Sequence, residues 1–214
     1  MFQRIRALSY AGMVGGIGIV ATAFVYANTH GTTTVNNMGQ LLGLNEQEWG
    51  RIAAVIPALL WAALLAFRLR IGDRITRLSA IGYRVASAAL AIRILSELPQ
   101  FFIDMRTDYQ SPLGMSSWLL YLLSLPLLSI GMLSISFGCK RIGMGGFMFY
   151  APLLAGLLTI PSFLAGGFLA EISDNGAIFR SSAVLLSIPQ GLAWIGIGIA
   201  ALLTDFPNRK GVCQ

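Results

Sequence analysis

Six long apolar segments constrain the fold of this chain more than any other feature. About 20 apolar residues are needed to cross the roughly 30 Å hydrocarbon layer of a bilayer, and each segment reaches that length. Charged residues make up 11% of the chain, against about 25% in a soluble domain. We therefore predict one all-α domain over residues 1–214, a polytopic integral membrane protein built as a six-helix transmembrane bundle. The predicted spans are 8–28, 46–67, 80–103, 113–138, 147–170 and 181–203.

Lysine and arginine residues gather in alternate connections between these spans. Ten of them lie in the N-terminal segment, the loops around 68–77 and 140–141, and the C-terminal tail, whereas the other connections hold only Arg51, Arg106 and Arg180. Because basic loops stay in the cytoplasm, both termini are predicted to be cytoplasmic in a bacterial-type plasma (inner) membrane. The expected partners at that face are anionic lipid headgroups. Nucleic acid is not expected, because the basic residues lie beside apolar spans.

The third predicted span carries polar residues on one narrow stripe. At about 100° per residue, positions 93 and 104 point within about 20° of each other. A charge at the bilayer centre costs at least about 2.5 kcal/mol, so this stripe should face other helices rather than lipid. Its polar part consists of Arg93, Glu97, Gln100 and Asp104. Towards the cytoplasmic side the stripe continues as the small residues Ala89, Ala86 and Gly82.

Two hypotheses explain this polar stripe. Arg93 and Glu97 are four residues apart, which allows an ion pair on one helix face. In the first hypothesis, the stripe lines a cavity and contacts a small polar or anionic solute, or Glu97 relays a proton. In the second, the pair is a buried structural lock between helices. The sequence leaves both open.

Prolines lie inside five of the six predicted spans, and central prolines predict kinks in membrane helices. Pro99 and Pro189 are each followed by a glutamine, Gln100 and Gln190. We predict that the two prolines act as hinges and that Gln190 joins the buried polar network.

The stretch from Ser96 through Pro99 and Gln100 to Tyr121 resembles the signature of the PQ-loop transporter family. This resemblance implies that Pro99 is a helix hinge beside a substrate path. That family is built from three-helix units, whereas only two predicted spans separate the two Pro-Gln dipeptides here and none follows the second.

Small residues crowd the first and last spans at the spacing that lets helices approach closely. We expect them to pack inside the monomer, and a homo-oligomer or a contact with other membrane subunits is the alternative. The serines of the fourth span are spread around the helix, so most should bond to their own backbone. The predicted packing residues are Gly12, Gly16, Gly196 and Ala200.

The sequence lacks the residue sets that enzymes and cofactor proteins need. His30 is its only histidine, and there is no C-x-x-C motif or glycine-rich phosphate loop. We therefore expect no catalytic residue, no metal, no cofactor and no enzymatic activity. The favoured function is a small permease or channel-like protein for a small polar or anionic solute. The alternative is an accessory or scaffolding subunit of a larger membrane complex.

Overall fold

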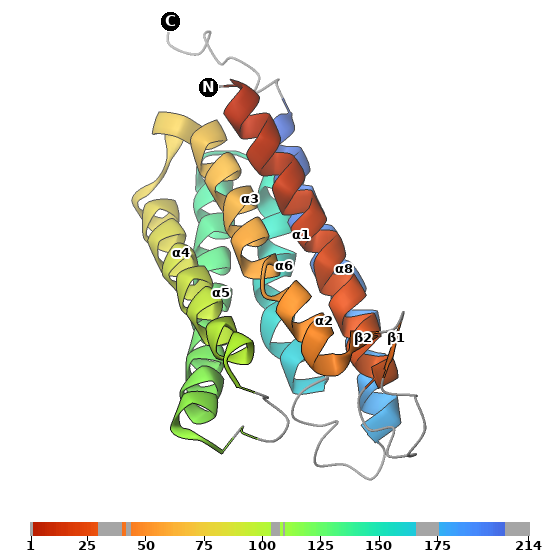
Figure 1. Ribbon diagram of the computed structural model, residues 1–214. Coiled ribbons are helices and arrows are strands. Elements are labelled where there is room, and N and C mark those ends of the chain that lie inside the picture. The colour runs from red at the N-terminus through yellow and green to blue at the C-terminus, as the bar shows by residue number, and fades with distance from the viewer. Residues whose placement is uncertain are drawn as a thin grey trace, which may run out of the picture.

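The computed structural model describes residues 2–29, 40–41, 44–103, 108, 110–165 and 176–203. Most of the described chain is helical (Figure 1). A short antiparallel hairpin pairs β1 (Gln40–Leu41) with β2 (Leu44–Asn45). His30 and most of the predicted external loop 29–45 lie outside the described residues. The helices are α1 (Phe2–Thr29), α2 (Glu46–Ala53), α3 (Ile56–Ile71), η1 (Gly72–Arg74), α4 (Arg77–Glu97), η2 (Leu98–Phe101), α5 (Pro112–Arg141), α6 (Phe147–Phe163) and α8 (Gly176–Leu202).

In the described part of the chain, five helices are long and apolar enough to cross a membrane. They correspond to the first four predicted spans and the last one. The fifth predicted span appears as α6, an apolar helix of 17 residues, and residues 166–170 of that span lie outside the described residues. The chain is thus a helical bundle suited to a membrane, while the sixth crossing stays a prediction.

The second predicted span, 46–67, is not one continuous helix. The helix is interrupted at Ala54 and Val55, so that α2 forms a separate eight-residue segment before α3. Pro57 explains the position of the break, because it lies in the first turn of α3 and has no backbone N–H to donate to the carbonyl of Ala53, the last residue of α2. Four further prolines of the predicted spans lie inside helices: Pro126, Pro152, Pro161 and Pro189. A kink at each of them stays a prediction.

Two helix starts follow the local chemistry of capping. Ser111 precedes the first-turn proline of α5, and its hydroxyl accepts a bond of 3.1 Å from the amide of Gly114. Thr76 caps α4 in the same way, through the amide of Ser79 at 3.0 Å. Helix α4 therefore begins at Arg77, three residues before the predicted span 80–103.

The helices form a ring in which α1 packs against α3 and α8, α8 against α6, α6 against α5, and α5 against α4. Contacts of α3 with α4 and α8 close the ring. Helices α1 and α8 lie side by side along most of their length (Figure 1). The largest fully buried side chains are apolar or aromatic and come mainly from α3, α4, α5 and α8. They include Trp194, Phe67, Leu64, Leu90, Met132 and Ile135.

Small residues allow the closest helix contacts. A Cβ atom on Gly16 would lie 2.6 Å from the carbonyl oxygen of Gly191, which joins α1 to α8. Gly12 lies against Ala63 of α3, and Gly196 against Ala151 of α6. Two further small residues also lie at helix contacts: Ala200, a predicted packing residue, and Gly82, a small residue of the α4 stripe. Ala200 is fully buried, and Gly82 packs on the α5 backbone at Gly131.

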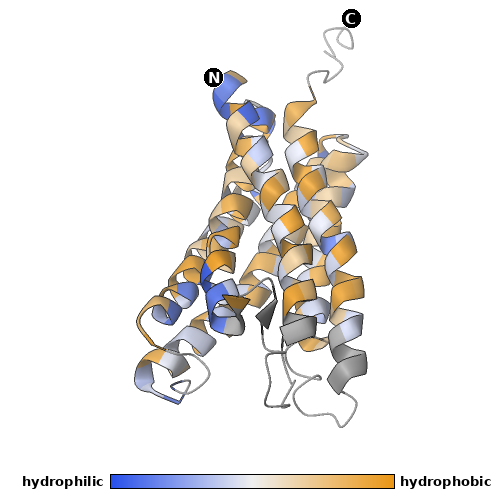
Figure 2. Ribbon diagram, turned by 45° about the vertical axis from the view of Figure 1, so that its right-hand side comes forward, coloured by the Kyte–Doolittle hydropathy of each residue, from blue (hydrophilic) through white to orange (hydrophobic). Residues whose placement is uncertain are grey.

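The two ends of the bundle differ in charge. The start of α1, the α3–α4 connection and the α5–α6 connection lie at one end of the bundle, and α8 also ends there (Figure 1). Hydrophilic residues lie near both ends, and apolar ribbon fills the length between them (Figure 2). We call the first end the basic end, because it carries Arg4, Arg6, Arg68, Arg70, Arg74, Arg77, Lys140 and Arg141. That it faces the cytoplasm stays a prediction.

Candidate functional site

A polar network lies at the end of α4 opposite the basic end. Arg93 Nε donates to Glu97 Oε1 at 2.9 Å, one helical turn further along α4. The other carboxylate oxygen, Oε2, accepts from the side-chain amide of Gln100 at 3.0 Å. Three members of the predicted stripe are thus joined in one chain of hydrogen bonds. Asp104 lies outside the described residues.

Helix α2 adds two residues to this network that the sequence analysis did not select. Gln47 Nε2 donates to the carbonyl oxygens of Gln100 and Ile103, at 2.7 and 3.0 Å. Arg51 Nε donates to the same Gln100 oxygen at 3.0 Å. Carbonyl groups at a helix end have no partner within the helix, so α2 supplies donors where η2 needs them. From here on, the polar network means Gln47, Arg51, Arg93, Glu97 and Gln100.

Gly50 lets α2 come this close to Gln100. A Cβ atom at position 50 would lie 2.6 Å from Oε1 of Gln100. Gln47 and Arg51 are polar residues one helical turn apart within a predicted apolar span. This spacing places both on one helix face, and it is the sequence pattern that could have predicted a contact of that face with protein.

Aromatic side chains support Arg93 from the side of α5. The guanidinium carbon of Arg93 lies 3.3 Å from the centroid of the Tyr121 ring. The Tyr121 ring in turn packs against Trp118 and against Phe163 of α6, with centroid distances of 5.9 and 5.4 Å. A cation over an aromatic face is stabilised by the ring quadrupole. The network therefore contacts α2 and α5, as expected for a stripe turned towards other helices.

The network is neither fully buried nor electrically neutral. The side chains of Arg93 and Glu97 are 26% and 23% exposed. Two guanidinium groups and one carboxylate leave a single net positive charge among its members. In the described part of the chain, Arg93 and Arg51 each use Nε for a hydrogen bond, and their Nη groups have no protein acceptor.

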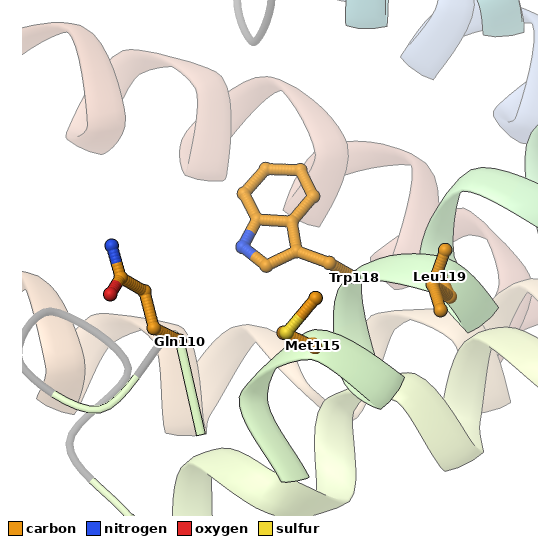
Figure 3. Close-up of a pocket in the computed structure, with 4 residues that line it drawn as sticks. All are labelled: Gln110, Met115, Trp118 and Leu119. Atoms are coloured by element: carbon orange, nitrogen blue, oxygen red, sulfur yellow. The ribbon is translucent and has the colours of Figure 1, made fainter. Parts of the chain in front are cut away.

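A hollow of about 280 Å³ lies at the start of α5 (Figure 3). None of its lining residues belongs to the polar network, so it is not the cavity predicted beside Glu97. The lining is almost entirely apolar, and the large side chains that form it are exposed to the surroundings of the bundle. It is lined by Gln110, Met115, Trp118 and Leu119.

Gln190 and Pro189 lie on α8, away from the network. Gln190 is half-buried, and within the described residues it makes no hydrogen bond to Arg93, Glu97 or Gln100. The next residue, Gly191, packs on α1. The structure therefore brings together the residues around the first Pro-Gln dipeptide and leaves the second one apart. Pro99 itself lies in η2, where α4 changes to a 3-10 helix.

The serines of α5 divide into two groups. The hydroxyls of Ser116, Ser124 and Ser134 bond to carbonyls of their own helix, as predicted. Three others bond across to a neighbouring helix instead, so the prediction for this helix was only half right. These are Ser117 to the carbonyl of Ser96 at 2.5 Å, Ser129 to that of Gly156 at 2.7 Å, and Ser136 to that of Phe149 at 2.8 Å.

Comparisons with known proteins add no assignment to this site. No family model, curated protein or solved structure matches the chain. The resemblance to the PQ-loop signature therefore has no wider support. Among the described residues, no group of three or more histidine, cysteine, aspartate or glutamate side chains could hold a metal ion.

Proposed function

We propose that this protein is a small permease-like membrane protein that binds a small anionic solute at Arg93. One observation carries the proposal: Arg93 pairs with Glu97 through Nε alone, so its Nη groups have no acceptor within the described chain. By the helical rise of about 1.5 Å per residue, Arg93 lies roughly 24 Å along α4 from Arg77, within the membrane-spanning length. An arginine within a membrane span is rare and commonly marks an ion or substrate pathway.

The surroundings of Arg93 suit reversible binding of an anion. Glu97 offsets part of the positive charge, and Tyr121 holds the guanidinium group against α5. An anion that accepts hydrogen bonds from the Nη groups would satisfy donors that otherwise need water. Because the Arg93 side chain keeps 26% of its surface exposed, such a ligand can reach it without disrupting the core.

A second candidate function is an accessory subunit in which the network only locks helices together. The specific observation in its favour is that α2, α4 and α5 are tied to one another by Gln47, Arg51 and Ser117, all bonded to backbone carbonyls of the α4–η2 segment. In that case the Nη groups of Arg93 would have only water as a partner.

Uptake of a panel of small anions into proteoliposomes tests the proposal. Arg93→Gln and Glu97→Gln should each abolish uptake, because the first removes the binding cation and the second leaves it poorly oriented. Arg84→Gln is the matched control, since Arg84 is an exposed residue of the same helix outside the network. If Arg93→Gln transports as well as Arg84→Gln does, the proposal is wrong.

The locking hypothesis makes a different prediction for the same variants. Arg93→Gln should then lower the melting temperature in mild detergent far more than Arg84→Gln, without any anion dependence. Size-exclusion chromatography with mass analysis should also reveal a stable partner of different sequence. A lone, anion-binding protein would rule this hypothesis out.

A further inference from the structure

Arg51 repeats the bonding pattern of Arg93 on the α2 side of the network. Arg51 lies on α2, where its side chain is exposed, and its Nε donates to the carbonyl oxygen of Gln100 at 3.0 Å. In both arginines the bonded atom is Nε, and in both the Nη groups have no acceptor in the described part of the chain. Each guanidinium group is therefore fixed along one edge and open at its end.

Gln100 connects the two arginines. Its backbone oxygen accepts from Arg51, and its side-chain amide donates to Glu97, which holds Arg93. The residue is 8% exposed, so this linkage is protected from solvent. Arg51 is exposed and the Arg93 side chain is 26% exposed, so Arg51 is the more accessible of the two guanidinium groups to an anion in solution.

We propose that Arg51 is the outer binding residue of an oxyanion path that continues to Arg93, so that the solute of this protein is a monovalent oxyanion such as a carboxylate. This inference rests on the proposed function and specifies its ligand. With Nε engaged, the end-on pair of Nη groups remains, and two parallel N–H groups match the two oxygens of a planar oxyanion. A spherical halide has one acceptor centre, so it can bridge the two N–H groups but cannot pair each of them with its own acceptor atom. The single net positive charge of the network suits a single negative charge on the ligand.

A role of Arg51 in merely holding α2 would be redundant. Gln47 already donates to the Gln100 oxygen and also to the Ile103 oxygen, without carrying a charge. The feature that Arg51 adds is a positively charged fork at an exposed position. Arg84 is the matched control, because it is an exposed arginine of α4 that lies outside the polar network.

Calorimetric titration of the purified full chain with sodium formate and with sodium chloride, at equal ionic strength, tests the inference. The parent protein should bind formate at least about tenfold more tightly than chloride. Arg51→Lys keeps the charge and loses the fork, so it should weaken formate binding about tenfold and leave chloride binding unchanged. Arg51→Gln keeps a donor for the Gln100 oxygen and should show the same loss for formate. Arg84→Lys should bind formate like the parent.

The outcomes separate this inference from the proposed function. If Arg84→Lys weakens formate binding as much as Arg51→Lys does, the loss is not specific to Arg51 and the inference fails. If Arg51→Gln binds formate like the parent, Arg51 only holds α2 and the inference fails as well. If Arg93→Lys weakens formate binding while both Arg51 variants match the parent, Arg93 remains the anion site and the role of Arg51 is rejected. If the parent shows no preference for formate over chloride, the oxyanion assignment falls. If it binds neither anion, the proposed function falls as well.

Discussion

Replacing Gly131 with leucine tests the contact that holds the site-bearing helix α4 against α5. A Cβ atom at position 131 would lie 2.6 Å from the amide nitrogen of Ala86, 2.8 Å from its Cβ and 2.9 Å from its Cα. Carbon atoms pack at about 3.5–4.0 Å, so even one added carbon requires the helices to part by about 1 Å. Backbone atoms form the obstacle, and they cannot rotate away as a flexible side chain would.

The expected cost follows from two opposing effects. Overpacking of a buried contact costs about 1–3 kcal/mol, and the upper end applies to a leucine that meets backbone. Leucine regains up to about 1 kcal/mol relative to glycine through helix propensity. The net loss is therefore about 2 kcal/mol, which lowers the melting temperature by about 4–8 °C in a chain of this size.

Thermal denaturation in mild detergent, followed by circular dichroism, measures this loss. Gly145→Leu is the control, because a Cβ atom at position 145 would meet nothing within 4 Å. Gly131→Ala should give a smaller loss than Gly131→Leu. If Gly131→Leu melts at the parent temperature, α4 and α5 do not pack as described, and the placement of Arg93 against Tyr121 loses its basis.

Three further substitutions address other contacts. Gly50→Ala should weaken formate binding severalfold in the calorimetric titration, because the added methyl group displaces the side chain of Gln100; unchanged affinity would remove the network from the binding site. Ser117→Ala should lower stability to thermal denaturation by about 1 kcal/mol, since it loses a bond to another helix, whereas Ser116→Ala, which loses a bond within its own helix, should be nearly neutral. Equal losses would contradict that distinction. Gly16→Leu should reduce the yield of folded monomer in size-exclusion chromatography, because its side chain would meet a backbone carbonyl of α8; a normal yield would argue against the α1–α8 contact.

Hydropathy and helical spacing predicted much of what positions the site. The long helices follow from the apolar segments, and the ion pair between Arg93 and Glu97 follows from their spacing on one helix. Extending the same stripe also placed Ala86 and Gly82 at a helix contact, where α4 meets α5. These features depend on residues close together in the sequence, so a single segment contains the information.

Hydropathy and helical spacing could not predict contacts between segments that are far apart in the sequence. Arg51 and Gln47 are about fifty positions from the carbonyls they bond, and nothing local indicates which helix end α2 will cover. Gln190 was assigned to the network because its dipeptide matched that of Gln100. The ring order of the helices places α8 beside α1 instead, a result that the shared dipeptide could not reveal. Ser117 presented the same difficulty, since a hydroxyl can bond its own helix or a neighbour.

The packing of α1 against α8 bears on the order in which the chain is completed during synthesis. Domains fold from the N-terminus as the chain emerges, yet Gly16 of α1 finds its partner only in Gly191 of α8. Until the ribosome has produced α8, the Gly16 side of α1 lacks its helix partner, and the core lacks Trp194. Helices α4 and α5 are adjacent in the sequence and can join earlier, as can α1 and α3 through Gly12 and Ala63. A nascent chain arrested before α8 should therefore hold formed α4–α5 and α1–α3 pairs and an α1 that is covered on one side only, and membrane proteases should remove it faster than the complete bundle.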